Sequence, residues 1–282
     1  MGDLKLRPTN ALDGLRLGIS VSDSADLPML GLHPHHAELA LAEIARSVLL
    51  LSGRLVYGGR IKPPGYTQFL LSELERYGAH PDSLTLCLAA PEHETLTVKE
   101  LKGLNNKLQT RGRVVCLSPS GLPMEMRSIS ELPEKQPSNS SSYSAMRQYL
   151  CENTDAQVIL GGQLEQFQGS MPGVIEEAIN SIKAEQPLYI VGGFGGAAAL
   201  VAKTLEIDGF DWAPSNFPIQ PDDKRIEDSL YELRSVADKS EASIRCSGLN
   251  ELDLRKLSAT HRPKEIASII VNGLAAVHSN SH

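Results

Sequence analysis

The stretch LYIVGGFGGAAALV, residues 188–201, is the part of the sequence that best indicates the fold. Its apolar start predicts a buried strand over 187–193, the glycines allow a sharp turn, and the alanine-rich end predicts a helix over 197–205. Strand, turn and helix in this order form the repeating unit of parallel α/β proteins. The segment from Gly193 to Ala198 also satisfies the G-x-G-x-x-G/A spacing of dinucleotide-binding turns.

The same alternation of strand and helix patterns occupies most of the chain before this stretch. Short apolar runs predict strands at 15–21, 54–59, 83–90, 113–119 and 156–162. Helical periodicity predicts helices at 37–53, 66–78, 98–112, 145–153 and 173–185. After these units the pattern predicts only helices, at 225–238, 251–260 and 263–279. We therefore expect an α/β fold, a Rossmann-like parallel sheet sandwiched by helices with a helical C-terminal extension, divided into a domain over 1–208 and an extension over 209–282 packed on it.

Composition and charge limit the classes of function. The 282 residues are 41% apolar, which is enough for a large core, and the net charge of −7 argues against general nucleic-acid binding, which needs a basic face. No run of about 18 apolar residues predicts a membrane span, and the first residues lack the apolar segment of a signal peptide, so we expect a cytoplasmic protein. Neither the four cysteines nor the HPHH stretch at 33–36 has the spacing of a metal site, and we expect no metal and no cofactor.

The position of the fingerprint argues against a dinucleotide-dependent dehydrogenase. In such enzymes the motif follows the first strand, and an acidic residue ends the next strand about 20 positions later. Here the match follows the last predicted strand, and the acids after it, Asp208 and Asp211, do not end a strand. The first unit, GISVSDSADLP at 18–28, lacks the glycines.

Glycine pairs at several strand ends suggest a different nucleotide site. Gly58–Gly59, Gly161–Gly162 and Gly192–Gly193 each follow a predicted strand, and ligands of open parallel sheets bind at these ends. A helix that starts behind such a turn presents free backbone N–H groups to a phosphate. The three pairs therefore predict a phosphate or pyrophosphate cradle, although ordinary turns also use glycine.

Residues 12–205 resemble the SLOG superfamily, which is named partly for the Lonely Guy cytokinin-activating phosphoribohydrolases. Those enzymes carry an arginine before their fifth strand and a P-G-G-x-G-T-x-x-E motif after it. The segments MRQYLCENTDAQVILGG and SMPGVIEE place Arg147, Gly173 and Glu177 at the matching positions. Val174 replaces the motif threonine, and QLEQFQG at 163–169 is an insertion, so the hydrolase chemistry is in doubt.

The resemblance is closer to the SLOG branch that includes the N-terminal domain of melastatin-type TRP channels and the sensor domains of Thoeris-type antiphage proteins. LVYGG…GYT, AMR…L, LGG…PGVIEEA and YIVGGFGGAA carry it. It implies a sensor that binds ADP-ribose or cyclic ADP-ribose, acts on an effector domain or protein, serves antiphage defence and forms a homo-oligomer. The alternative is a nucleotide N-glycosidic-bond hydrolase, such as a phosphoribohydrolase or nucleosidase; a protein that has lost its ligand is a third reading.

The resemblance also assigns roles to individual residues. Arg147 would pair with a phosphate or a carboxylate, or is an ordinary surface arginine. Glu177 would bind ribose hydroxyls or act as a general acid or base, or is a first-turn glutamate. Both would be catalytic in the hydrolase alternative. Phe194 would stack on a base or pack under its turn. The ligand-binding set is Ser20, Ser22, Gly58, Gly59, Arg60, Arg147, Gly161, Gly162, Pro172, Gly173, Glu176, Glu177, Gly193, Phe194 and Gly195.

Overall fold

A seven-stranded sheet organises the protein. The computed structural model describes residues 10–61, 65–125, 139–240 and 245–280. The strands are β1 (Arg16–Ser22), β2 (Arg54–Gly58), β3 (Leu84–Leu88), β4 (Gly112–Leu117), β5 (Pro123–Met124), β6 (Ala156–Gly161) and β7 (Leu188–Val191). Their order across the sheet is β5-β4-β3-β2-β1-β6-β7, and all pairs are parallel except β4 with β5. The predicted parallel α/β architecture is confirmed, and the six strands predicted from apolar runs are all present.

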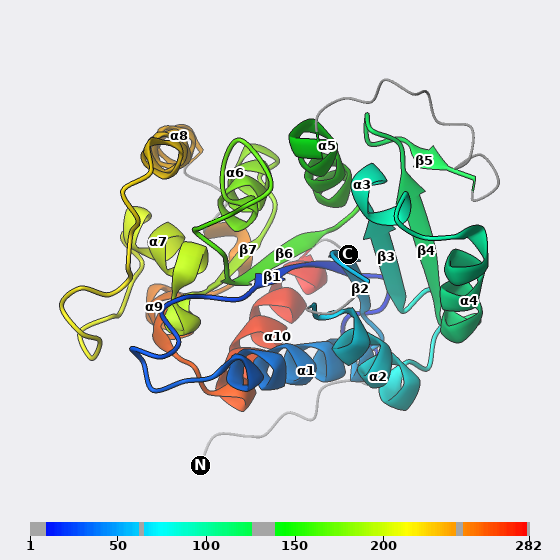
Figure 1. Ribbon diagram of the computed structural model, residues 1–282. Helices are drawn as coiled ribbons and strands as arrows, with labels where there is room; N and C mark the ends of the chain where they lie inside the picture. The colour runs from blue at the N-terminus through cyan, green and yellow to red at the C-terminus, as the bar shows by residue number, and fades with distance from the viewer. Residues whose placement is uncertain (1–9, 62–64, 126–138, 241–244, 281–282) are drawn as a thin grey trace, which may run out of the picture.

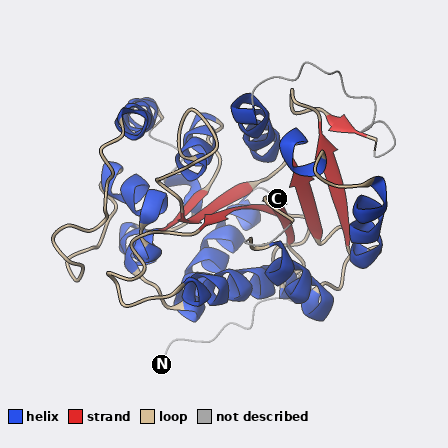
Figure 2. Ribbon diagram, in the orientation of Figure 1, coloured by secondary structure: helices blue, strands red, loops and turns tan. Residues whose placement is uncertain are grey.

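Helices cover both faces of this sheet, as Figures 1 and 2 show. They are α1 (Pro34–Leu50), α2 (Thr67–Tyr77), α3 (Ala90–His93), α4 (Val98–Leu108), α5 (Asn139–Glu152), α6 (Gly173–Lys183), α7 (Gly196–Thr204), α8 (Lys224–Lys239), α9 (Glu251–Ala259) and α10 (Pro263–Asn280). Helices α1, α2 and α10 lie on one face, whereas α5 and α6 lie on the other, and α8 packs on α6 and α7. None of the described helices is long and apolar enough to cross a membrane.

The predicted C-terminal helices are present, and the last of them belongs to the main core. Ile266, Ile270 and Leu274 of α10 are fully buried in the same apolar cluster as Leu17 and Ile19 of β1. Helix α10 therefore forms, together with α1, the layer that covers the middle of the sheet (Figure 1). The division at residue 208 stays a prediction.

Some elements differ from the sequence prediction. Helix α1 begins at Pro34 rather than at 37, because His33 is its N-cap and the Nδ1 atom of His36 accepts the His33 backbone N–H at 3.0 Å. The described part of α5 begins at Asn139 rather than at 145. Strand β5 and helix α3 were not predicted, since two and four residues are too short to show a period.

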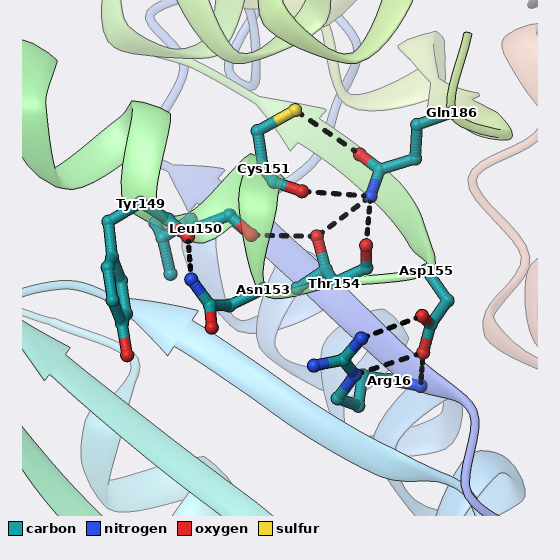
Figure 3. Close-up of polar contacts among 8 residues, drawn as sticks. All are labelled: Arg16, Tyr149, Leu150, Cys151, Asn153, Thr154, Asp155 and Gln186. Carbon is teal, nitrogen blue, oxygen red and sulfur yellow. Dashed lines mark hydrogen bonds and ion pairs between the residues drawn. The ribbon is translucent and has the colours of Figure 1, made fainter. Parts of the chain in front are cut away.

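A polar network, drawn in Figure 3, connects the amino-terminal ends of strands in the middle of the sheet. The Gln186 side-chain amide donates to the backbone oxygen of Thr154 at 2.6 Å and to its hydroxyl at 2.9 Å. Next to it, Asp155 pairs with Arg16 through both carboxylate oxygens, at 2.9 and 3.1 Å. These contacts join the start of β6 to the start of β1 and to the turn before β7. The carboxyl ends of the strands lie on the opposite side of the sheet, where a ligand site can form.

Candidate functional site

A cavity of about 570 Å³ opens at the carboxyl ends of β1, β2 and β6. The chain runs from β1 outward to β2, β3 and β4 on one side and places β6 and β7 on the other, so the cavity lies at the reversal of strand order. This is the position at which open parallel sheets bind their ligands, and the volume lies within the usual range for small-molecule sites.

The structure brings most of the predicted site residues to this one cavity. Those that line it are Ser20, Ser22, Gly58, Gly59, Arg60, Arg147, Gly162, Gly173 and Glu177. Those that do not line it are Gly161, Pro172, Glu176, Gly193, Phe194 and Gly195. The first set comes from five separate segments of the chain, which only the fold brings together.

An arginine and two carboxylates form the centre of the site. Arg147 lies on α5, and its side chain, 10% exposed, donates from Nη1 to Glu176 at 2.5 Å. Its Nε atom lies 3.9 Å from Oε1 of Glu177. Both glutamates lie in the first part of α6, so the buried guanidinium joins two neighbouring helices across the cavity wall. The surface-arginine interpretation of Arg147 does not fit this burial.

Glu177 is held at the base of the site by neutral hydrogen-bond donors. Gln157 of β6 donates its side-chain amide to Oε2 at 3.0 Å, and the Ser20 hydroxyl also hydrogen-bonds to the carboxylate. Gln157 has room to reach Glu177 because the neighbouring β1 residue is Gly18, where a Cβ would lie 1.9 Å from the Gln157 side-chain oxygen. This glycine was not recognised as functional from the sequence.

The environment of Glu177 makes it a proton-exchanging group at neutral pH. The pKa of the Glu177 carboxyl is raised from 4.5 to about 7; burial in the protein is the largest cause, and the charge of Glu176 acts in the same direction. Arg147 is the main opposing influence, followed by the hydrogen bonds from Ser20 and Gln157. A carboxyl with this pKa is suited to general acid–base chemistry.

The N-terminus of α6 is the part of the site that suits an anion. The helix begins at Gly173 after Pro172, without a side-chain cap. Gly173 and Val174 line the cavity, and within the described residues their backbone N–H groups have no hydrogen-bond acceptor. Gly173 is required here because a Cβ would lie 2.5 Å from Nη2 of Arg147. Free N–H groups, the helix dipole and a guanidinium therefore converge on one place.

The N-terminus of α7, by contrast, is already occupied by the protein's own carboxylate. Asp26, which is 1% exposed, accepts the backbone N–H of Gly196 at 2.7 Å and that of Ile219 at 3.0 Å. A Cβ on Gly195 would lie 2.3 Å from the Asp26 Cβ, so the glycine turn makes room for Asp26. This corrects the expectation of a phosphate cradle at this turn.

Phe194 and the other glycine pairs also serve internal packing. The Phe194 side chain is fully buried in the main core and does not reach the cavity, which corrects the expectation that it stacks on a base. Gly193 packs against the backbone oxygen of Thr260, and Gly59 gives the Tyr57 ring the space to fold under its turn. Gly59 and Gly193 therefore allow close packing around the site, and Gly58, Gly59 and Gly162 also line the cavity.

Two hydroxyl–carboxylate pairs form a second polar side of the cavity. Tyr66 donates its hydroxyl to Asp23 at 2.8 Å, and Tyr143 donates to Glu92 at 2.7 Å. Arg60 lies 3.9 Å from the same Glu92 oxygen. Burial is the largest cause that raises the pKa of both tyrosines above the ordinary value, so they act as hydrogen-bond donors at neutral pH.

Several lining residues were missed in the sequence, for different reasons. The GYT segment was part of the resemblance, but its Tyr66 was not given a role. Asp23 and Asp26 stand in the loop after the first strand, and nothing in the sequence distinguishes them from ordinary loop acids. The missed lining residues with polar or aromatic side chains are Asp23, Ser24, Asp26, Tyr57, Tyr66, Glu92, Tyr143, Gln163, Glu165, Phe167 and Gln168.

The fold and the cavity define a Rossmann-like α/β protein with a ligand site at the switch point of its sheet. The SLOG cluster2 family matches residues 11–261, which is most of the chain, and the protein belongs to this family. SLOG domains form a superfamily of nucleotide-related sensors and hydrolases, which implies a nucleotide-like ligand. No curated protein matches the sequence.

Proposed function

We propose that this protein binds an adenine-nucleotide-derived signal of the ADP-ribose or cyclic ADP-ribose type and acts as its sensor. The observation that carries the proposal is the open N-terminus of α6 beside Arg147, at the cavity on the switch point of the sheet. A phosphate there would accept the free N–H groups of Gly173 and Val174 and hydrogen bonds from the guanidinium. Ser20, Tyr66 and the acidic side of the cavity supply hydrogen-bond partners for ribose hydroxyls.

The second candidate is hydrolysis of the N-glycosidic bond of a nucleotide. It is favoured by Glu177, whose pKa of about 7 and position beside Arg147 suit a general acid or base. Against it stands Val174, which is buried at the position where the Lonely Guy motif has a threonine hydroxyl. The two candidates use the same cavity and differ in whether Glu177 takes part in bond cleavage.

One experiment separates them. The purified protein is incubated with ADP-ribose, cyclic ADP-ribose, NAD and AMP, and both the melting temperature and the release of base or ribose phosphate are measured. Stabilisation without turnover supports the sensor. Free ligand at 100 times its Kd should raise the free energy of unfolding by about 2.7 kcal/mol. Turnover that disappears in Glu177→Gln supports the hydrolase. A melting temperature unchanged by all four compounds, without turnover, rejects both.

The proposal also covers the location of the protein in the cell, its biological role, its assembly and its domain division. We propose that it acts in the cytoplasm, in antiphage defence, as a homo-oligomer that regulates an effector domain or protein. The proposed division is a nucleotide-binding domain over 1–208 with the helical extension over 209–282 packed on it. Sedimentation with and without ADP-ribose tests the oligomer, and limited proteolysis of the full chain, with the first cut expected near residue 208, tests the division.

A further inference from the structure

The loop between β6 and α6, residues 162–172, carries an aromatic ring into the cavity. Phe167 is half-buried and lines the cavity, together with Gln163 and Gln168 from the same loop. The loop contains the segment 163–169 that is inserted relative to the Lonely Guy motif. None of these three residues has a place in the phosphate-binding or acid–base parts of the site.

The ring of Phe167 is held in place by a cation from the C-terminal part of the chain. The guanidinium carbon of Arg225, at the start of α8, lies 4.2 Å from the ring centroid. Arg225 is itself fixed by Asp223, which accepts from Nη2 at 2.6 Å and from Nε at 3.1 Å. A guanidinium at this distance stacks on one face of the ring and keeps the ring oriented. The contact with Arg225 therefore restrains the loop at Phe167, the residue whose ring lines the cavity.

The chemistry around Phe167 suits a purine base. An aromatic side chain that lines a ligand cavity offers a π face, and bases stack on such faces. Gln163 and Gln168 each carry a donor and an acceptor in one amide, the combination that pairs with N6 and N7 of adenine. Ile219 and Pro221, from the segment before α8, add apolar lining to the same cavity.

We infer that Phe167, backed by Arg225, is the stacking platform for the adenine base of the ligand, and that Gln163 and Gln168 recognise the edge of this base. The inference rests on the proposed nucleotide binding, and it defines the orientation of the nucleotide in the cavity. The phosphate lies at the N-terminus of α6 beside Arg147, and the base lies on the loop that precedes this helix. Recognition of the base thus depends on the inserted segment and on α8.

The test measures ADP-ribose binding to the full chain by calorimetry for wild type, Phe167→Leu, Phe167→Tyr and Arg225→Gln. Loss of base stacking predicts an affinity about 10- to 100-fold lower for Phe167→Leu, and recovery in Phe167→Tyr, which keeps the ring. Arg225→Gln should weaken binding about 3- to 10-fold, because it removes the cation that orients the ring. Arg234→Gln, an exposed arginine on the same helix, is the matched control and should bind like wild type.

A second measurement separates stacking from a loss of structure. The fluorescence of etheno-ADP-ribose should be quenched on binding to wild type and to Phe167→Tyr, and less so in Phe167→Leu at saturation, while the melting temperatures of the free proteins stay equal. If wild type binds ADP-ribose and Phe167→Leu binds it within twofold, the platform is refuted and the proposed function stands. If wild type binds none of ADP-ribose, AMP and cyclic ADP-ribose, the proposed function fails and the platform fails with it.

Discussion

Replacement of Asp26 by asparagine should destabilise the protein strongly, although the two side chains have nearly the same shape. The buried carboxylate accepts two backbone N–H groups, from Gly196 at 2.7 Å and from Ile219 at 3.0 Å. Hydrogen bonds to a charged group contribute about 1.5–3 kcal/mol each. Asparagine keeps one acceptor oxygen but turns an NH₂ group toward the other N–H and removes the charge at the N-terminus of α7. We expect a loss of about 3 kcal/mol in the free energy of unfolding.

Calorimetric or fluorescence-detected melting can measure this loss. For a chain of this length the entropy of unfolding is about 0.6 kcal/mol per kelvin, so 3 kcal/mol lowers the melting temperature by about 5 °C. Because asparagine cannot accept both N–H groups, the hold on Ile219 weakens, and proteolysis should cut the segment 207–223 faster in Asp26→Asn than in wild type. Asp211→Asn, an exposed aspartate in the same segment, is the control. A shift for Asp26→Asn no larger than that of the control would refute the assigned role of Asp26.

The remaining predictions concern the glutamate, the arginine and two glycines. The pKa of Glu177 is raised from 4.5 to about 7 in the folded state, so the contribution of this group to stability is fully present below about pH 4.5 and is lost, by about 3 kcal/mol, as pH rises through about 7. Denaturant titrations between pH 5 and 8 should show that Glu177→Gln removes this part of the pH dependence. Arg147→Met leaves two carboxylates buried without their cation and should cost about 3–5 kcal/mol at pH 8. The cost should be smaller at pH 5, where Glu177, whose pKa is raised, is protonated, and an equal cost at both pH values would contradict the ion pair. Gly195→Ala places a Cβ 2.3 Å from Asp26 at a backbone φ of 78°, and a loss of more than about 2 kcal/mol is expected in the same melting assay. Gly173→Ala places a Cβ 2.5 Å from the Arg147 guanidinium, which Glu176 and Glu177 hold. Both the melting temperature and the affinity for ADP-ribose should therefore fall, and an unchanged affinity would oppose the phosphate assignment.

The parts of the fold that a local pattern encodes could be predicted from the sequence. Runs such as LRLGISV at 15–21 show apolar continuity within a few residues, and this is enough for a buried strand. Strand β5 is two residues long and pairs antiparallel to β4, and no period exists at that length. The order of the strands was not predicted from the sequence, whereas the place of the cavity follows from the rule that open parallel sheets bind ligands at the carboxyl ends of their strands.

The site was harder to predict because its contacts join distant segments. Arg147 and Glu177 could be found from the resemblance, since each lies in a recognisable motif. Asp26 and Gly196 are 170 residues apart, and the sequence alone does not show that one binds the other. The space that Gly18 leaves for Gln157 is likewise a contact between neighbouring strands that no spacing reveals. A glycine in the sequence indicates that another group packs closely against its backbone, but it does not show which group this is.

The N-termini of α6 and α7 therefore have different roles, and this difference limits how a nucleotide can bind. Helices α6 and α7 both begin behind a strand end, where a phosphate would be stabilised by free N–H groups. At α7 the Gly196 N–H already donates to Asp26, and a second anion brought there would meet this buried carboxylate at short range. At α6 the cavity is lined by Gly173 and Val174, next to the Arg147 guanidinium, which offsets the charges of Glu176 and Glu177. The buried Asp26 therefore argues against a pyrophosphate at the GFGG turn, although the sequence of this turn fits the dinucleotide fingerprint. The proposed phosphate position is therefore on α6, and the proposed ligand extends from there along the 162–172 loop.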